Sequence, residues 1–252
     1  MQTLLEPARL LVSASTVYAT RLVREVSDLH RAQALRYRVF NLELNEGLAG
    51  SVATGRDEDP FDAVCDHLVV EYLPTQEIVG TYRLQTGLKA AAHRGYYSER
   101  EFEFAPYESI RGQLIELGRA CVHQQHRNLV VLGLLWKGIA DYAKSRGGRY
   151  LCGCSSLTSQ DPTMGASAYA ELCRRHLASF EWRTCPRFEY ACEMDQLHAD
   201  PVKVPKLLRA YLGMGAKICG PPAIDREFKT IDFLTLLDLE TLPPLVRGRF
   251  LS

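Results

Sequence analysis

The amino-acid sequence predicts a single α+β domain in which a mixed, mostly antiparallel sheet is flanked by helices. A strand, a polar turn and a helix follow one another in residues 113–148. Two neighbouring apolar stretches, 65–72 and 78–85, are joined by a short polar segment and predict a hairpin-like strand pair. The 252 residues contain no internal repeat. Strands and helices mixed in this way favour an α+β architecture.

The central unit, residues 113–148, is the strongest local pattern. Residues 114–123 are short, apolar and bounded, which is typical of a strand. The following apolar side chains recur at intervals of three and four, which predicts a helix ending at Gly147; they are Val130, Val131, Leu134, Leu135, Ile139 and Tyr142. The turn before this helix offers free backbone N–H groups, which suit a phosphate.

The remaining elements follow from the same rules. An N-terminal strand is expected at 20–26, followed by a helix that Ser27 caps and Gly47 ends. The apolar stripe expected on this helix is Leu29, Ala32, Leu35, Val39 and Leu42. Residues 48–63 form a long polar loop. Later elements are a strand at 149–156, a helix at 166–177, an irregular insertion at 179–205, a helix through Tyr211 and a strand at 230–239.

The composition restricts the class of function. Lysine plus arginine equals aspartate plus glutamate, 30 each, so the net charge of zero argues against nucleic acid as a partner. Eight cysteines without a regular spacing indicate reduced thiols in a cytoplasmic protein. No apolar run approaches the roughly 18 residues of a membrane span.

Two charges inside the central strand are the first site candidates. Glu116 and Arg119 lie among apolar residues, and a buried charge costs several kcal/mol unless it is paired. They form either a functional site or an internal ion pair. Arg36 and Phe40 are four residues apart on one helix, where they could line a pocket, or Arg36 could be solvated.

The sequence gives little support for a metal or a bound cofactor. Three pairs at i, i+2 could chelate in principle: Cys65/His67, Cys121/His123 and Cys152/Cys154. Structural zinc sites instead use cysteines on turns with two to four residues between them, whereas each of these pairs has one, so no metal is expected. Signatures of phosphate-binding loops, dinucleotide-binding folds and serine nucleophiles are missing from the sequence.

An ordered set of motifs resembles a known family. The motifs are RYRVF at 36–40, DPFD at 59–62, CDHLVV at 65–70, IVGTYRL at 78–84, ELGRACV at 116–122, HRNLVVLGLLWKGIADY at 126–142 and PPAIDREFKTIDFL at 221–234. In this order they resemble the acyl-carrier-protein-dependent N-acyl amino acid synthases of the GNAT superfamily, and among these the ornithine-lipid enzymes. The resemblance covers roughly 21–240 and extends more distantly to acyl-homoserine-lactone synthases.

The resemblance implies a GNAT fold and an N-acyltransferase of lipid biosynthesis. Such an enzyme would move a long-chain 3-hydroxyacyl group from acyl carrier protein to the α-amine of an amino acid, with ornithine as the expected acceptor. The substrate-binding residues implied are Arg36, Phe40, Asp59, Asp62, Arg83 and Arg119. The alternatives are an enzyme like the lactone synthases, which have a tryptophan where this chain has Glu46, or a non-catalytic protein that binds an acyl carrier or a lipid.

The donor site is expected at the start of the central helix. The segment QQHRNLVV has no glycine before Gly133, so its backbone cannot closely approach the diphosphate of coenzyme A. Acyl carrier protein, with one phosphate on its phosphopantetheine arm, is therefore favoured over acyl-coenzyme A as co-substrate. The residues expected to bind that arm are Cys121, Val122, Arg127 and Asn128.

The chemistry requires a base, oxyanion donors and charged partners for the amino acid. Glu116 is the first candidate for the base, and the pair Asp66/His67 is the second. A β-bulge marked by Gly118 would bring Glu116 and Arg119 to one site and supply backbone N–H groups for the oxyanion. Candidates for binding the α-carboxylate are Arg36, Arg83 and Arg119, and candidates for the δ-ammonium of ornithine are Asp59 and Asp62.

The C-terminal tail, residues 242–252, combines apolar and basic side chains without an acid. It is expected either to fold back on the domain, which is favoured, or to rest on the inner face of a membrane as a peripheral contact.

Overall fold

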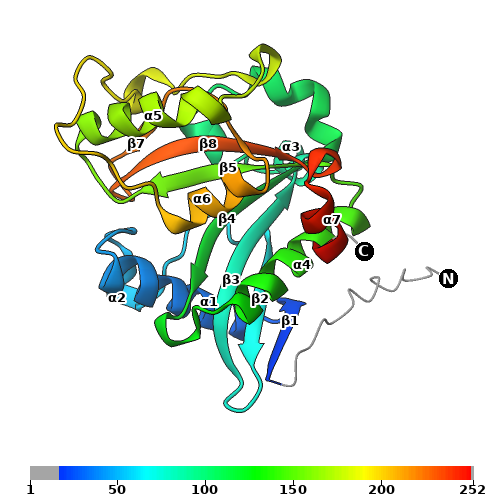
Figure 1. The fold of residues 1–252 in the computed structure, drawn as a ribbon. Coiled ribbons are helices and arrows are strands. Elements are labelled where there is room, and N and C mark those ends of the chain that lie inside the picture. The colour runs from blue at the N-terminus through cyan, green and yellow to red at the C-terminus, as the bar shows by residue number, and fades with distance from the viewer. Residues whose placement is uncertain (1–16, 251–252) are drawn as a thin grey trace.

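The computed structural model describes residues 17–250 and shows one eight-stranded sheet with helices on its faces (Figure 1). The strand order is β1-β2-β3-β4-β5-β8-β6, and β7 also pairs with β8. Within the described residues all neighbouring strands are antiparallel except β4 and β5, which are parallel. The expected α+β class with a mostly antiparallel sheet is confirmed.

The sheet has two halves that meet at the parallel pair. The first half contains β1 Tyr18–Leu22, β2 Asp66–Tyr72, β3 Glu77–Thr86 and β4 Leu114–Val122. The second half contains β5 Tyr150–Leu157, β6 Lys217–Ile218, β7 Ala223–Asp225 and β8 Thr230–Asp238. The two-residue β6 and the three-residue β7 are too short to give a period in the sequence, and they were not predicted.

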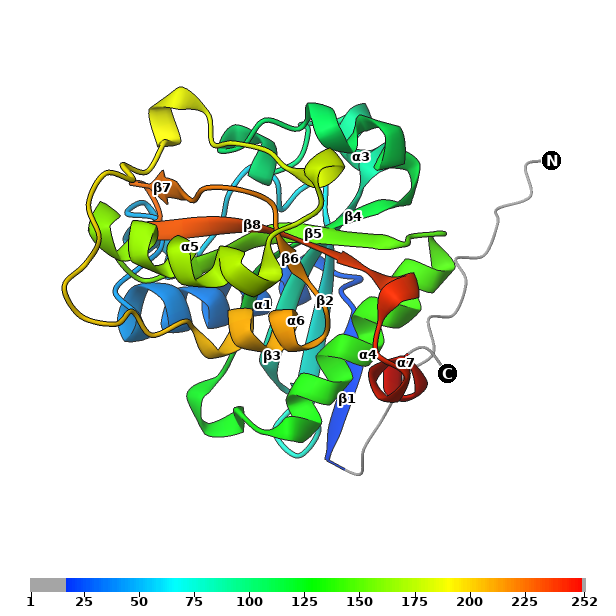
Figure 2. The ribbon, with the colours of Figure 1, turned by 45° about the horizontal axis from the view of Figure 1, so that its top comes forward.

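Helices cover both faces of the first half-sheet (Figure 2). The long helices are α1 Val26–Tyr37, α4 Leu129–Ser145 and α5 Pro162–His176, and the shorter ones are α2 Ser51–Thr54, α3 Gly87–Ala92, α6 Lys206–Gly213 and α7 Pro244–Phe250. Along β2, Leu68 and Val70 pack with α4, whereas Val69 packs with α1. This alternation is the two-residue period of a strand buried on both faces.

Helix α1 differs from its prediction at both ends. Glu25 occupies the N-cap position without a side-chain hydrogen bond, so Ser27 does not cap the helix. After Tyr37 the chain continues as a π-helix, Arg38–Glu43. The wider π turn changes the directions in which the side chains within it point. Leu42 is therefore 66% exposed, whereas Val39 and Phe40 are buried.

The C-terminal segment folds back on the domain. Leu242 is buried and Val246 is partly buried against the core that contains Trp136 and Ile139 of α4. Residues 251–252, the side chains of Arg249 and Phe250, and the apolar N-terminal residues 1–16 lie outside the described part of the chain. Between residues 17 and 250, no helix is both long and apolar enough to cross a bilayer.

Candidate active site

A cavity of about 670 Å³ opens where the two halves of the sheet separate. Strands β4 and β5 pair only over Leu114–Glu116 and Tyr150–Cys152, and beyond these residues they diverge (Figure 1). Residues from the diverging parts of both strands then line the cavity. The close approach at the branch point needs a glycine, because a Cβ on Gly153 would lie 2.2 Å from the Leu117 carbonyl oxygen.

The predicted bulge is present in β4, one residue after the glycine that was expected to mark it. Thr81 pairs with Cys121 and Arg83 with Gly118, so that Arg119 and Ala120 together face the single residue between them on β3. Arg119 has a φ of 50°, in the left-handed region. The extra residue bends the strand and disrupts its regular ladder. As expected, Glu116 and Arg119 both line the cavity although they are three residues apart.

Glu116 is a buried carboxylate held by backbone donors. Its oxygens accept hydrogen bonds from the N–H groups of Tyr97, at 2.8 Å, and Ser98, at 2.7 Å. Burial raises the pKa of Glu116 above its ordinary value, and the two backbone hydrogen bonds oppose this shift only in part. A fixed carboxylate with a raised pKa, in the wall of a cavity, has the properties that a general base requires.

The other predicted charged residues form a buried network. Arg36 is fully buried and donates to Asp57 Oδ1 at 2.7 Å and to Asp62 Oδ1 and Oδ2 at 2.9 and 2.7 Å. Arg83 donates to Asp59 Oδ1 at 2.6 Å and to Asp62 Oδ1 at 3.0 Å, and Arg119 donates to Asp59 Oδ2 at 2.9 Å. The acidic loop predicted at 48–63 thus supplies counter-charges for three arginines.

This network changes the expected roles of Arg36, Asp59 and Asp62. None of the three lines the cavity. Burial by itself would raise the pKa of Asp62, but Arg36 and Arg83 outweigh it and hold the pKa well below its ordinary value. The oxygens of Asp59 and Asp62 are occupied by guanidinium groups, so the expectation that one of them binds the δ-ammonium of ornithine is wrong. Arg36 anchors the loop and does not reach the cavity.

Arg83, Arg119 and Phe40 do line the cavity. The guanidinium of Arg119 lies 4.8 Å from the ring centroid of Tyr97 and 4.4 Å from that of Phe228. Arg83 lies 5.2 Å from the Tyr97 ring, and Phe40 packs edge-on against Phe228. Two arginines are therefore held by rings and carboxylates in the wall of the cavity, and the expectation that one of them binds the α-carboxylate of the amino acid stays a prediction.

The structure does not bring Asp66 and His67 to the site. Adjacent residues of a strand point to opposite faces of the sheet. Asp66 accepts a hydrogen bond from Tyr142 at 2.7 Å and pairs with Lys89 at 2.8 Å, whereas His67 Nε2 lies 3.0 Å from the Asp62 carbonyl oxygen. Neither residue lines the cavity, and the geometry therefore favours Glu116 as the base.

The four predicted donor-binding residues, Cys121, Val122, Arg127 and Asn128, all line the cavity. Asn128 Oδ1 caps α4 by accepting from the N–H groups of residues 130 and 131, both at 3.0 Å. Arg127 forms a bidentate pair with Glu43 and donates to the Val122 carbonyl oxygen at 3.0 Å. A phosphate at this helix start would therefore compete with Asn128 and Glu43. Burial raises the pKa of the Cys121 thiol, which stays protonated.

Several residues around the cavity were not identified from the sequence. Tyr97 and Ser98 hold Glu116, and they come from a stretch that the sequence showed only as aromatic and irregular. Three more carboxylates line the cavity, Glu46, Asp225 and Asp232, and a fourth, Glu101, lies beside Asp232. The motif at 221–234 contains two of them and is the one local signal that could have found them.

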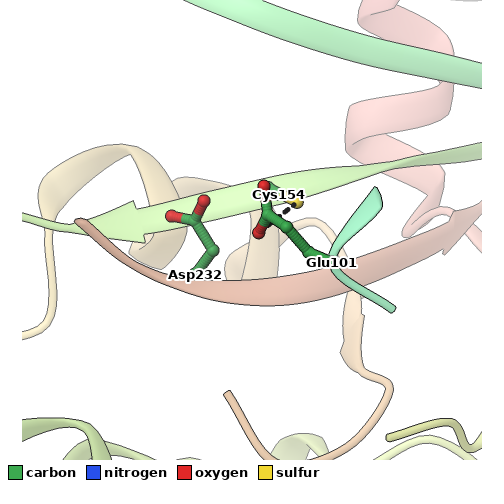
Figure 3. A group of neighbouring side chains, drawn as sticks. All are labelled: Glu101, Cys154 and Asp232. Carbon is green, nitrogen blue, oxygen red and sulfur yellow. Dashed lines mark hydrogen bonds between the residues drawn. The ribbon is translucent and has the colours of Figure 1, made fainter. Parts of the chain in front are cut away.

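One group among the described residues has the spacing of a cation site. The ligand atoms of Glu101, Cys154 and Asp232 all lie within 4.8 Å of one another (Figure 3). In the same part of the chain, none of the three pairs that the sequence singled out forms such a group.

Comparisons with known proteins show which family the chain belongs to. The acetyltransferase (GNAT) domain family matches residues 35–137. L-ornithine N(alpha)-acyltransferase of Agrobacterium fabrum is 33% identical over 248 residues, which is 92% of this chain and 83% of that protein. The enzyme of the same name from Rhodobacter capsulatus is 30% identical, covering 92% of this chain and 94% of that protein.

Solved structures show the shared fold. FeeM, an N-acyl amino acid synthase from uncultured soil microbes, superimposes with a TM-score of 0.55 at 12% identity, covering 92% of this chain and 96% of that chain. The acyl-homoserine-lactone synthase LasI gives a TM-score of 0.51 at 12% identity, covering 92% and 94%. The two ornithine enzymes, in contrast, are 33% and 30% identical to this chain across most of both chains. The protein therefore belongs to the L-ornithine N(alpha)-acyltransferase family and is an acyltransferase with the GNAT fold.

Proposed function

We propose that the protein transfers a long-chain (3-hydroxy)acyl group from acyl carrier protein to the α-amine of L-ornithine. The observation that carries the proposal is the cavity between β4 and β5, which has Glu116 and Arg119 in its wall and an otherwise largely apolar lining. The apolar side chains that could surround an acyl chain include Leu117, Ala120, Leu132, Leu135, Leu151 and Leu237. The names of the relatives support ornithine as the acceptor.

The reaction joins an amine to a thioester carbonyl. Glu116, directly or through a water, takes a proton from the α-ammonium group, because only the neutral amine has a free electron pair. The amine nitrogen attacks the carbonyl carbon, and the oxyanion accepts hydrogen bonds from backbone N–H groups at the bulge around Arg119. The C–S bond then breaks, the amide forms, and the thiolate receives the second proton lost by the nitrogen.

The donor is proposed to be carrier-bound for two reasons. The segment before α4 has no glycine that would let the backbone close around a diphosphate. Arg127, which is paired with Glu43, offers one cation near the start of α4. One arginine suits the single phosphate of a phosphopantetheine arm.

A panel of acceptors tests the proposal. The protein is incubated with 3-hydroxyacyl carrier protein and, separately, each of the twenty amino acids and ornithine, and thiol release and product mass are measured. We expect N-acylornithine as the main product. Thiol release that needs S-adenosylmethionine in place of an amino acid would indicate a lactone synthase. Binding of the carrier without any thiol release would indicate a binding protein.

Peripheral contact with a membrane stays a prediction. The expected product is a lipid, and Leu245 of α7 is 90% exposed beside the exposed Arg247. If the outer face of α7 rests on anionic lipid, Leu245→Glu lowers cosedimentation with anionic vesicles at low salt and leaves the solution reaction unchanged. Equal sedimentation of parent and variant would contradict it.

A further inference from the structure

Three buried carboxylates, Glu46, Asp225 and Asp232, line the cavity, and a fourth, Glu101, lies beside Asp232 without lining the cavity. Glu46, Glu101, Asp225 and Asp232 have 6%, 1%, 4% and 3% of their surfaces exposed. In the described part of the chain, no arginine or lysine forms an ion pair with any of them, in contrast to the acidic loop that neutralises Arg36, Arg83 and Arg119. Buried carboxylates are normally paired, because the uncompensated charge is costly.

Asp232 carries a buried oxygen atom, Oδ1, without a hydrogen-bond partner among the described residues. Asp232 also lines the cavity. Glu101 lies next to Cys154, because its Oε2 accepts a hydrogen bond from the Cys154 thiol at 3.7 Å (Figure 3). Asp225 is better satisfied, because its Oδ1 accepts from the N–H groups of residues 227 and 228, both at 2.8 Å. The open acceptor is therefore on Asp232, and the carboxylate of Glu101 lies within 4.8 Å of it.

Burial and the like charges of neighbouring carboxylates raise the pKa values of Glu46, Glu101 and Asp232. Burial raises the pKa of Asp232 to about 6, and the nearby Asp225 adds to the shift. Burial also raises the pKa of Glu46 to about 7, with a further contribution from Asp232, and it raises the pKa of Glu101 in the same direction. A bound cation would reverse these shifts, because it stabilises the charged form of each carboxylate.

The cluster lies at a suitable distance from Glu116. On β5, Cys152 pairs with Glu116, and two residues further Cys154 contacts both Ser98 Oγ and Glu101. Two residues of a strand advance roughly 6.5 Å. The α- and δ-nitrogens of extended ornithine are separated by five bonds, roughly 6 Å with ordinary bond lengths. An amino acid whose α-amine meets Glu116 therefore reaches Glu101 and Asp232 with its second nitrogen.

We propose that Glu101 and Asp232 bind the δ-ammonium group of the diamino acid acceptor and so determine its selection over monoamino acids. This assignment rests on the proposed N-acyl transfer and gives the acceptor's second charge a defined place. An ammonium group has three N–H donors and no acceptor, which fits a pair of neighbouring carboxylates. A monoamino acid leaves the same carboxylates buried and unpaired, and this penalty is the physical basis of the selection.

Cys154 adds a hydrogen-bond donor to this group. Its thiol lies 3.4 Å from Ser98 Oγ and 3.7 Å from Glu101 Oε2, and its one S–H group can donate to either of them. Burial raises the pKa of Cys154 well above its ordinary value, with Glu101 and Asp232 adding to the shift.

The test compares two acceptors that differ in one charged group. L-ornithine and norvaline, its analogue without the δ-amine, are offered separately with the same acyl carrier donor, and kcat/KM is measured for each. The parent should prefer ornithine. Asp232→Asn and Glu101→Gln should each lower the ornithine-to-norvaline ratio about 30-fold or more, mostly through the ornithine value. Glu71→Gln, at an ion pair with Arg21 on the outer strand pair, should leave the ratio unchanged.

Every outcome decides the proposal. The ratio is independent of the amount of folded enzyme, and a parent without preference for ornithine overturns the assignment even if both variants fail to fold. Variants that lower both rates equally also overturn it, while N-acyl transfer stands. If the parent acylates no amine, the proposed function fails, and calorimetric binding of ornithine against norvaline still tests the cluster. A stoichiometric Mn²⁺ or Zn²⁺ ion that ornithine does not displace would make it a metal site instead.

Discussion

At the scale of single residues, Glu116 combines a raised pKa with a fixed position. Its two backbone donors come from Tyr97 and Ser98, so the orientation of the carboxylate depends on a segment distant in sequence. Each carboxylate oxygen has a second lone pair, which can accept from the amine or from a water. Orientation and proton affinity are thus set by different neighbours.

Replacing Glu116 by Gln should abolish the base while keeping the shape. We expect turnover to fall roughly 10²- to 10⁴-fold, the usual contribution of a general base, with carrier binding nearly intact. The amide NH₂ would face a backbone N–H group, so a lower melting temperature should accompany the loss. Activity above about a tenth of the parent's, measured on folded variant, would show that Glu116 is not the base.

Substitutions of Arg127 and of Glu43 should change the KM for acyl carrier protein in opposite directions. Arg127→Ala should raise KM for acyl carrier protein and reduce the salt dependence of its use, because one charge contact is lost. Glu43→Gln should lower the same KM, because Arg127 no longer has a competing carboxylate. The assignment fails if acyl-coenzyme A serves as well as the carrier and neither substitution changes either rate.

At the scale of elements, the branch between β4 and β5 depends on a close backbone contact. The parallel pair is only three residues long on each strand, and Gly153 follows it directly. The strands must come together here and separate immediately afterwards for the cavity to exist. The apolar helix α4 and helix α1 hold the first half-sheet from its two faces, so the separation occurs on the β5 side.

Gly153→Ala should therefore disturb both folding and activity. The added Cβ would lie 2.2 Å from a backbone carbonyl, which can be relieved only if a strand moves. We expect a loss of about 1–3 kcal/mol of unfolding free energy, typical of overpacking, together with a reduced kcat. Gly112→Ala is the matched control, since a Cβ there meets nothing within 4 Å. Equal urea midpoints for the two variants would contradict the prediction.

At the scale of the whole molecule, the buried charges form two groups, one paired with opposite charges and one not. The arginine network around the loop at 57–62 is internally neutralised, whereas the carboxylates of Glu46, Glu101, Asp225 and Asp232 are not. The first group is paired within the fold, and the second has no arginine or lysine partner among the described residues.

This division predicts a specific pH dependence. The pKa of Glu46 is raised from 4.5 to about 7, so between these values the folded state keeps a proton that the unfolded chain has lost. The free energy of unfolding therefore decreases as the pH rises through this window. Asp62, whose pKa is lowered, contributes stability above its unfolded pKa that is lost as the pH falls towards the folded value.

Urea unfolding at a series of pH values measures the effect. From pH 4.5 to 7 the parent should lose on the order of 1–2 kcal/mol more than Glu46→Gln, which cannot titrate. Thr158, which donates to Glu46, is kept in both proteins. Parallel pH curves for parent and variant would mean that Glu46 does not hold its proton in the folded state.

Several elements could be predicted from short stretches of the sequence. The stripe on α4, the β2–β3 pair and the two charges of β4 were all visible, because periodicity and burial cost act over a few residues. Part of the cavity wall could also be predicted: Glu116 and Arg119 from their charges in an apolar strand, the start of α4 from its basic turn, and Phe40 and Arg83 from the family resemblance.

The pairing of the charged residues could be seen only in the tertiary structure. Asp59 and Asp62 pair with arginines that follow 21 to 60 residues later, and Glu101 comes close to Asp232 from a separate segment. The π-helical turn that exposes Leu42 also depends on packing against the sheet rather than on its own sequence period. Local patterns report whether a residue is buried, but the partner of a buried charge is fixed by the arrangement of strands and loops, which the sequence pattern does not contain.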